Sequence, residues 1–155
     1  MSEYFATVQW ERQKDEAFVD SKYSREHRWL FDGGAVIQAS PSPHIVPLPY
    51  SIASHVDPEE AFVASLSSCH MLFFLSIAAQ RNFIIDEYLD QAIGVLGKNS
   101  VGKLSMTQVT LRPKIIFSGD ILPTAKQIET IHHQSHEQCF IANSVKTKIV
   151  IEMIP

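Results

Sequence analysis

The sequence predicts an α+β domain in which helices pack on antiparallel β-sheet. Three observations support this fold class: a long apolar helix beginning near Asp57, several short alternating segments separated by turn residues, and a second, amphipathic helix after Pro123. At 155 residues the chain suits a single domain, 1–155, whose core needs no disulfide or metal.

The central helix has a well-specified start. Asp57 is a good N-cap, Pro58 suits the first helical position, and Glu60 can complete a capping box. From Ala61 to Ala79 no residue is charged, and apolar side chains fall on nearly every face. This pattern predicts a helix that is buried all round. Four serines and a histidine interrupt the run, so a buried helix of a soluble protein is favoured over a membrane span.

The N-terminal third reads as β-structure. Residues 4–10 alternate as a strand does, and residues 23–40 predict a hairpin because an Asp-Gly-Gly turn separates two apolar segments. Period two places Arg25 on the face that carries Trp29 and Phe31. An arginine on such a face either points at a site or lies at the rim of the core.

The remaining segments complete the order of elements. Residues 40–56 contain four prolines and form a long connection whose apolar members suit a pocket wall or a dimer contact. Residues 86–97 and 104–117 predict two strands, residues 123–138 a second helix, and residues 144–154 a closing strand.

Charge and cysteine content exclude several classes of protein. A formal net charge of −4 with mixed signs gives no basic surface for nucleic acid and no polybasic patch for a membrane. Two distant cysteines do not make a secreted disulfide framework, and the N-terminus has no apolar signal-peptide core. We therefore expect a cytoplasmic protein with small or uncharged partners.

The two cysteines lie on the two predicted helices. Cys69 is at the middle of the first helix and Cys139 is at the end of the second. A free thiol has a pKa near 8.5, so only about 3% is thiolate at pH 7. Apolar surroundings disfavour the Cys69 thiolate, and the helix C-terminus disfavours the Cys139 thiolate. Two interpretations remain open. The cysteines are inert residues of the core, or one of them is an attacking thiol that a nearby arginine activates.

Glu59 suggests how the central helix is used. It precedes Cys69 by ten residues, which places it about 80° round the helix and roughly 15 Å along it. The two side chains cannot touch within one helix. They could meet if two copies of the helix packed antiparallel across a two-fold axis, which predicts a homodimer.

Two stretches of the sequence resemble a known family. The stretch VDPEEAFVASLSSCHM, followed about seventy residues later by HEQCFIANSV, is similar to the OsmC/Ohr family of thiol peroxidases, whose members reduce organic hydroperoxides. The most specific part is a proline and a glutamate that open a long helix, with a cysteine ten residues after the glutamate. The resemblance implies the OsmC-like fold, an intertwined homodimer with two sites at its interface, each shaped by both chains.

The resemblance also implies roles for individual residues. Cys69 is then the peroxidatic thiolate, Cys139 the resolving thiol, and Glu59 the carboxylate that orients an arginine onto the reactive sulfur. Arg25 and Arg28 both lie in the corresponding hairpin, and the alternation favours Arg25. The implied cycle needs no cofactor: Cys69 becomes a sulfenic acid, Cys139 condenses with it to a disulfide, and an external dithiol, such as a lipoyl group, reduces that disulfide.

Other interpretations stay open beside this one. Active peroxidases of the family commonly have a proline after the second cysteine, where this chain has Phe140. His132, His136 and Cys139 share one helical face and are a weak candidate for a zinc site. The alternative function is a non-enzymatic OsmC-like dimer that binds a small hydrophobic ligand or senses redox state.

Overall fold

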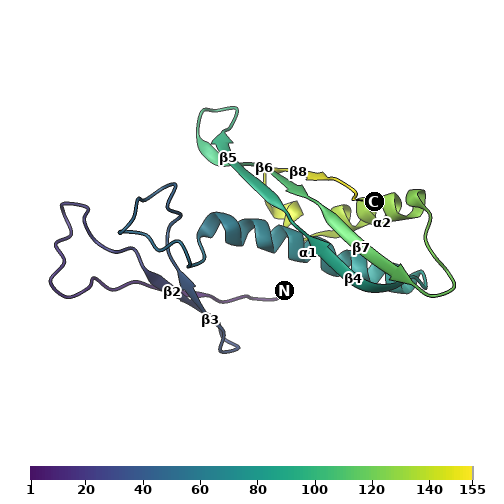
Figure 1. The fold of residues 1–155 in the computed structure, drawn as a ribbon, viewed down its shortest axis with the longest axis horizontal. Helices are drawn as coiled ribbons and strands as arrows, with labels where there is room; N and C mark the ends of the chain where they lie inside the picture. Colours follow the sequence, from purple (N-terminus) through teal and green to yellow (C-terminus); the bar gives the residue numbers. More distant parts are fainter. Residues whose placement is uncertain (155) are drawn as a thin grey trace. The chain divides into compact units, whose positions relative to one another are not determined.

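The structure is a computed structural model that describes residues 1–154. The chain divides into two compact units, with the division between Ala61 and Phe62. The long helix α1 (Pro58–Gln80) starts in the first unit and continues through the second (Figure 1).

The first unit contains a three-stranded antiparallel sheet in the order β1 (Thr7–Gln9), β2 (His27–Leu30) and β3 (Val36–Ala39). The predicted hairpin is confirmed, and Gly34 adopts a positive φ of 97° in its turn. Strand β1 is shorter than the predicted 4–10, because only these three residues pair with β2.

The proline-rich connection is ordered and returns to the sheet. Ala39 and Val56 form a parallel bridge, in which the Ser40 amide donates to the Val56 carbonyl at 3.0 Å. Within the connection, the Ser40 hydroxyl accepts from the Ile52 amide at 2.7 Å. These bonds place the end of the connection beside β3, where α1 begins.

The predicted start of α1 is confirmed. The Glu60 amide donates to Asp57 Oδ1 and the Asp57 amide donates to Glu60 Oε1, each at 2.8 Å, which is a complete capping box. The helix ends before Asn82, whose positive φ of 63° is typical of the residue that terminates a helix.

The expectation that α1 is buried all round is wrong for the single chain. One stripe is buried, at Leu66, His70, Phe74, Ile77 and Ala78. The opposite face is open, and its Leu72 is 59% exposed. The reason is that the second unit covers only one side of the helix. By length and composition alone α1 could span a membrane, a property it shares with core helices of soluble proteins.

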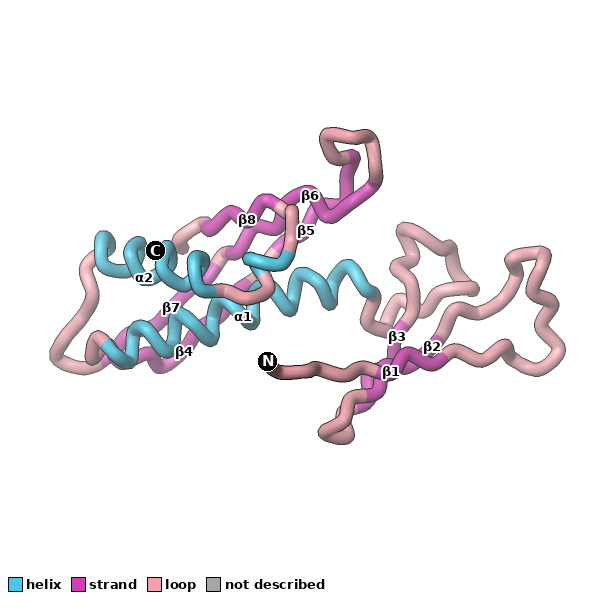
Figure 2. The backbone as a smooth tube through the Cα atoms, turned by 180° about the vertical axis from the view of Figure 1, so that it is seen from behind, coloured by secondary structure: helices cyan, strands magenta, loops and turns pink. Residues whose placement is uncertain are grey.

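The second unit has two small sheets. One pairs β4 (Ile84–Asp90) with β7 (Pro113–Ser118), and the other has the order β5 (Ile93–Lys98), β6 (Leu104–Leu111) and β8 (Lys148–Ile151). The pairs are antiparallel except β6 with β8, which are parallel and are joined through β7 and helix α2 (Ala125–Gln138). Figures 1 and 2, from opposite sides, show α1 and α2 on the same side of β4 and β7.

The two long strands predicted at 86–97 and 104–117 are in fact four, because each passes from one sheet to the other. At this corner the Asp90 carboxylate accepts a hydrogen bond from the Arg112 amide at 2.6 Å and another from the Ser67 hydroxyl of α1. The Asp90 side chain therefore connects the two points at which the chain changes sheet, and it bonds them to α1.

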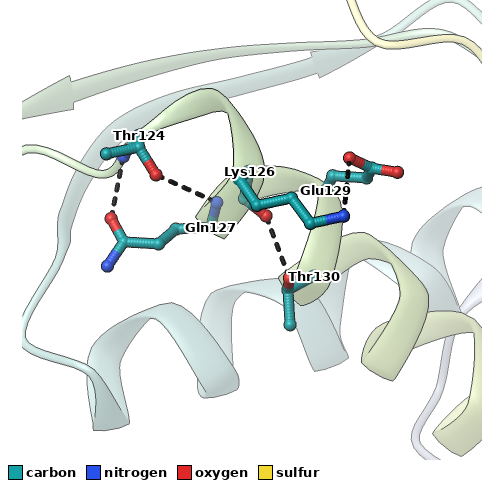
Figure 3. A network of polar contacts seen from close by, with 5 residues as sticks. All are labelled: Thr124, Lys126, Gln127, Glu129 and Thr130. Carbon is teal, nitrogen blue, oxygen red and sulfur yellow. Dashed lines mark hydrogen bonds and ion pairs between the residues drawn. The ribbon is translucent and has the colours of Figure 1, made fainter.

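Helix α2 (Ala125–Gln138) has its own capping box. The Thr124 hydroxyl accepts from the Gln127 amide at 3.2 Å, and the Gln127 side chain accepts from the Thr124 amide at 2.8 Å (Figure 3). A short 3-10 helix, η1 (Ala142–Ser144), follows it. The closing strand β8 is consequently shorter than the predicted 144–154.

The core of the second unit consists of two clusters along α1. Phe74, Ile77 and Ala78 pack with Ile131 of α2, and Leu66 packs with two residues of β6. Helix α2 is thus packed on α1, and this contact is the one that brings the two cysteine-bearing segments together.

Candidate functional site

A pocket of about 480 Å³ opens in the first unit. Three aromatic side chains, Trp10, Phe18 and Tyr23, form much of its wall and contact one another, with ring centroids 4.5 to 5.8 Å apart. Arg25 and Glu59, two of the four predicted site residues, line the same pocket. The pocket can therefore hold an organic group next to a cation and a carboxylate.

Arg25 is held firmly by its own neighbourhood. Its Nη1 donates to the carbonyls of Ser21 at 2.8 Å and Tyr23 at 2.6 Å. Its guanidinium carbon lies 3.7 Å from the centre of the Tyr23 ring, a cation–π contact. Its backbone amide donates to the Tyr50 carbonyl at 3.0 Å. The arginine is thus fixed by loops on both sides of the hairpin.

His27 fixes the same segment from β2. Its Nδ1 lies 2.8 Å from the Arg25 carbonyl, and the Trp29 indole donates to its Nε2 at 3.1 Å. A carbonyl only accepts and an indole N–H only donates, so His27 carries its hydrogen on Nδ1 and is neutral in this arrangement.

Glu59 does not pair with Arg25. Within residues 1–154 the two side chains make no ion pair, and the buried Glu59 Oε2 has no hydrogen-bond partner. An unsatisfied buried carboxylate oxygen is costly, so Glu59 is available to a donor. The other candidate arginine, Arg28, does not line this pocket and instead donates to Gln9 Oε1 at 2.9 Å.

The two free thiols are neighbours in the second unit. Cys69 is half-buried on α1, and Cys139 is fully buried at the C-cap of α2. Burial raises the pKa of Cys139 to about 11, and the hydrogen bond with the Cys69 side chain adds to this shift. The Ala142 amide acts in the opposite direction, because it donates to the Cys139 sulfur at 3.4 Å. Cys139 is therefore a protonated thiol at neutral pH.

A pair of buried histidines lies in the contact between α1 and α2, and the sequence offered only one of them, His132, as a candidate ligand. His70 and His132 are hydrogen-bonded to each other, and burial lowers the pKa of each to about 4. The only signal in the sequence is that His70 falls on the stripe of α1 that also carries Leu66 and Phe74.

The proposed zinc ligands do not form a site in the described part of the chain. Among residues 1–154 no group of three or more His, Cys, Asp or Glu side chains is placed to hold a metal ion. His132 directs its Nδ1 to His70 instead of toward His136 and Cys139.

Comparison with known proteins identifies the family. The family model for OsmC-like proteins matches residues 52–154. No curated protein matches the chain. A solved OsmC-like protein of unknown function from Vibrio cholerae is 59% identical, covers 99% of this chain and 100% of its own, and has a TM-score of 0.98.

More distant solved structures share the fold. An OsmC-like protein from Mycoplasma pneumoniae is 15% identical with a TM-score of 0.73, covering 99% of this chain and 96% of its own. An organic hydroperoxide resistance protein from Elizabethkingia anophelis is 15% identical with a TM-score of 0.70, covering 99% and 94%. The expected OsmC-like α+β fold is confirmed, and the chain belongs to the OsmC-like protein family.

Proposed function

We propose that this protein is a thiol-dependent peroxidase that reduces organic hydroperoxides. The observation that carries the proposal is the placement of a half-buried thiol, Cys69, beside a fully buried thiol, Cys139, on two packed helices. The fold shared with an organic hydroperoxide resistance protein supports the choice of substrate.

In the proposed cycle the Cys69 thiolate attacks one peroxide oxygen. The O–O bond breaks, an alcohol leaves after taking up a proton, and Cys69 becomes a sulfenic acid. The Cys139 sulfur then attacks the Cys69 sulfur, the S–O bond breaks, and water leaves with the thiol proton. An external dithiol, such as a lipoyl group, reduces the resulting disulfide.

The proposed working unit is a homodimer in the cytoplasm. Glu59 of one protomer approaches the level of Cys69 of its partner, and Arg25 supplies the cation that stabilises the attacking thiolate. The open apolar face of α1 supports a second copy as its cover. The unpartnered Glu59 Oε2 supports an arginine contact, for which Arg25 exchanges its carbonyl partners for Glu59.

A second function is favoured by one observation, the aromatic pocket of about 480 Å³. A pocket of this size and lining suits a small hydrophobic ligand. In that case the protein is a binding or redox-sensing dimer, and its thiols do not turn over.

Peroxide consumption separates the two functions. With tert-butyl hydroperoxide and dihydrolipoamide, we expect turnover by the wild type, none by Cys69→Ser, and unchanged turnover by Ser100→Ala, a substitution in the exposed turn between β5 and β6. Cys139→Ser should accumulate a sulfenic acid that dimedone traps. A wild type that consumes no hydroperoxide, or a Cys69→Ser variant that still does, would overturn the peroxidase.

A further inference from the structure

The contact between α1 and α2 contains a buried pair of histidines. His70 Nε2 and His132 Nδ1 are 3.0 Å apart, the ring centroids are 5.3 Å apart, and the ring planes differ by 13°. The centroids are farther apart than the nitrogens by about one ring diameter. This is the geometry of a hydrogen bond that lies in the plane of both rings, not of two rings stacked face to face.

The hydrogen bond requires one of the two facing nitrogens to carry no hydrogen, so the two imidazoles cannot both be protonated. One nitrogen donates and the other accepts, whereas two protonated rings would both present donors. The side chains are only 1% and 4% exposed, and burial keeps the pKa of each histidine low. His136 lowers the pKa of His70 further, and Asp90 of β4 acts in the opposite direction. At neutral pH the pair is therefore a complementary donor and acceptor.

The histidine pair and the two thiols connect the same two helices. On α1, His70 directly follows Cys69, and on α2, His132 precedes Cys139 by seven residues. Seven residues are close to two helical turns, so His132 and Cys139 lie on nearly the same face of α2. Two contacts of that face with α1 are His132 with His70 and Cys139 with Cys69.

Phe140 adds a third contact at this level. Its ring meets the edge of Phe73 of α1, with centroids 5.1 Å apart and planes at 88°. This contact lies at the surface, because the Phe140 side chain is 71% exposed. Among these three contacts, the histidine hydrogen bond is the one whose two side chains are both buried, and it constrains a distance and two ring orientations at once.

We propose that the His70–His132 hydrogen bond is the positioning contact that keeps Cys139 beside Cys69 for disulfide closure. Its use in a catalytic cycle rests on the proposed peroxidase function, but closure can be driven without a peroxide. Diamide accepts two electrons and two protons from the two thiols at its N=N bond, which becomes a hydrazine as the S–S bond forms.

The experiment measures the rate of diamide-driven closure at pH 7 in the full chain. His132→Leu removes the hydrogen bond and should slow closure by about tenfold or more, since a buried partner is left unpaired. In His70→Gln/His132→Asn, the amide groups lie near the positions of the two bonded nitrogens. This double variant should close within about threefold of the wild type, because it retains a neutral donor and acceptor. His133→Leu, an exposed neighbour on α2, should not change the rate.

A third variant separates positioning from simple destabilisation. His70→Leu/His132→Leu removes both polar groups, so no unpaired nitrogen remains in the core. We expect it to be folded by circular dichroism and yet to close as slowly as His132→Leu. Closure at the wild-type rate in this variant would overturn the proposal, as would equal rates in His132→Leu and His133→Leu or slow closure in the amide double variant.

Failure of the peroxidase function gives a different result. A wild type that closes its disulfide with diamide but consumes no hydroperoxide would overturn the enzyme while leaving the positioning role supported. A wild type that fails to close with diamide would overturn the positioning role, whatever its activity toward peroxides.

Discussion

Arg25 is bound at its amide, its carbonyl and its guanidinium, and these contacts come from three different segments. Tyr50 of the proline-rich connection accepts from its amide, and His27 of β2 bonds its carbonyl. Arg28, three residues later, is bonded to Gln9 and does not line the aromatic pocket. The two arginines therefore offer a matched comparison, in which a cation is removed from the pocket or from outside it.

We expect Arg25→Ala to slow the oxidation of Cys69 by tert-butyl hydroperoxide by about tenfold or more, because the proposed cation no longer stabilises the attacking thiolate. Arg28→Ala should stay within about twofold of the wild type, since its charge is exposed and screened. Stopped-flow tryptophan fluorescence can follow the oxidation. Equal slowing in both variants would show that Arg25 is not the activating residue.

Among the elements, those defined by local chemistry could be predicted from the sequence. The capping box of α1 depends only on Asp57 and Glu60, and the hairpin depends only on its turn, so both are as expected. The corner at Asp90 could not be predicted, because it depends on Ser67 of another element.

The candidate site also has features that the sequence predicts and features that depend on tertiary packing. The spacing of Cys69 and Cys139 on two helices was visible in the sequence, but the His70–His132 contact depends on how those helices pack. The resemblance implied that Glu59 orients an arginine, and the single chain does not pair it with Arg25, because the carbonyls of the loop before β2 take the guanidinium.

The capping box makes a prediction about α1. Asp57→Ala removes the acceptor for the Glu60 amide and should lower the free energy of unfolding by about 1 kcal/mol. Urea unfolding followed by circular dichroism measures this change. Asp57→Ser keeps a capping oxygen and should recover most of the loss. If the serine and alanine variants were equally destabilised, the cap would not be the cause.

The helix pair also predicts how stability depends on pH. In the folded protein burial lowers the pKa of His70 and His132 from 6.5 to about 4. As pH falls from 6.5 toward 4, the unfolded chain binds protons that the folded chain does not, so the free energy of unfolding falls. The first proton costs roughly 3 kcal/mol, at 1.36 kcal/mol for each pKa unit.

Urea midpoints at pH 7.5, 6 and 5 test this dependence. The wild type should lose stability over this range, and His70→Gln/His132→Asn should lose less, because it lacks both titrating rings. Parallel pH profiles for the two proteins would contradict the assignment of the effect to this pair.

At the scale of the whole molecule, the open face of α1 is the feature that a single chain leaves unexplained. The apolar stripe of α1 is buried in the second unit, while the opposite face carries small residues around one exposed leucine, at Ala64, Ser65, Ser68, Leu72, Ser76 and Ala79. Small side chains allow two helices to approach closely, so this face suits contact with a second copy of the same helix. This face therefore favours the proposed homodimer.

Leu72→Lys tests the homodimer directly. In a two-fold contact each substitution acts twice, and each buried leucine contributes about 1.5–3 kcal/mol. We therefore expect dimer affinity to fall by about a hundredfold or more, and the variant to sediment as a monomer at micromolar concentration where the wild type is a dimer. Leu122→Lys makes the same change at a leucine of similar exposure, 60% against 59%, in the loop before α2, and should leave the dimer intact.

If Leu72→Lys and Leu122→Lys sediment alike, the open face of α1 is not the dimer contact. If the wild type itself is a monomer, Glu59 cannot reach the thiol of a partner, and the activating carboxylate must be sought elsewhere.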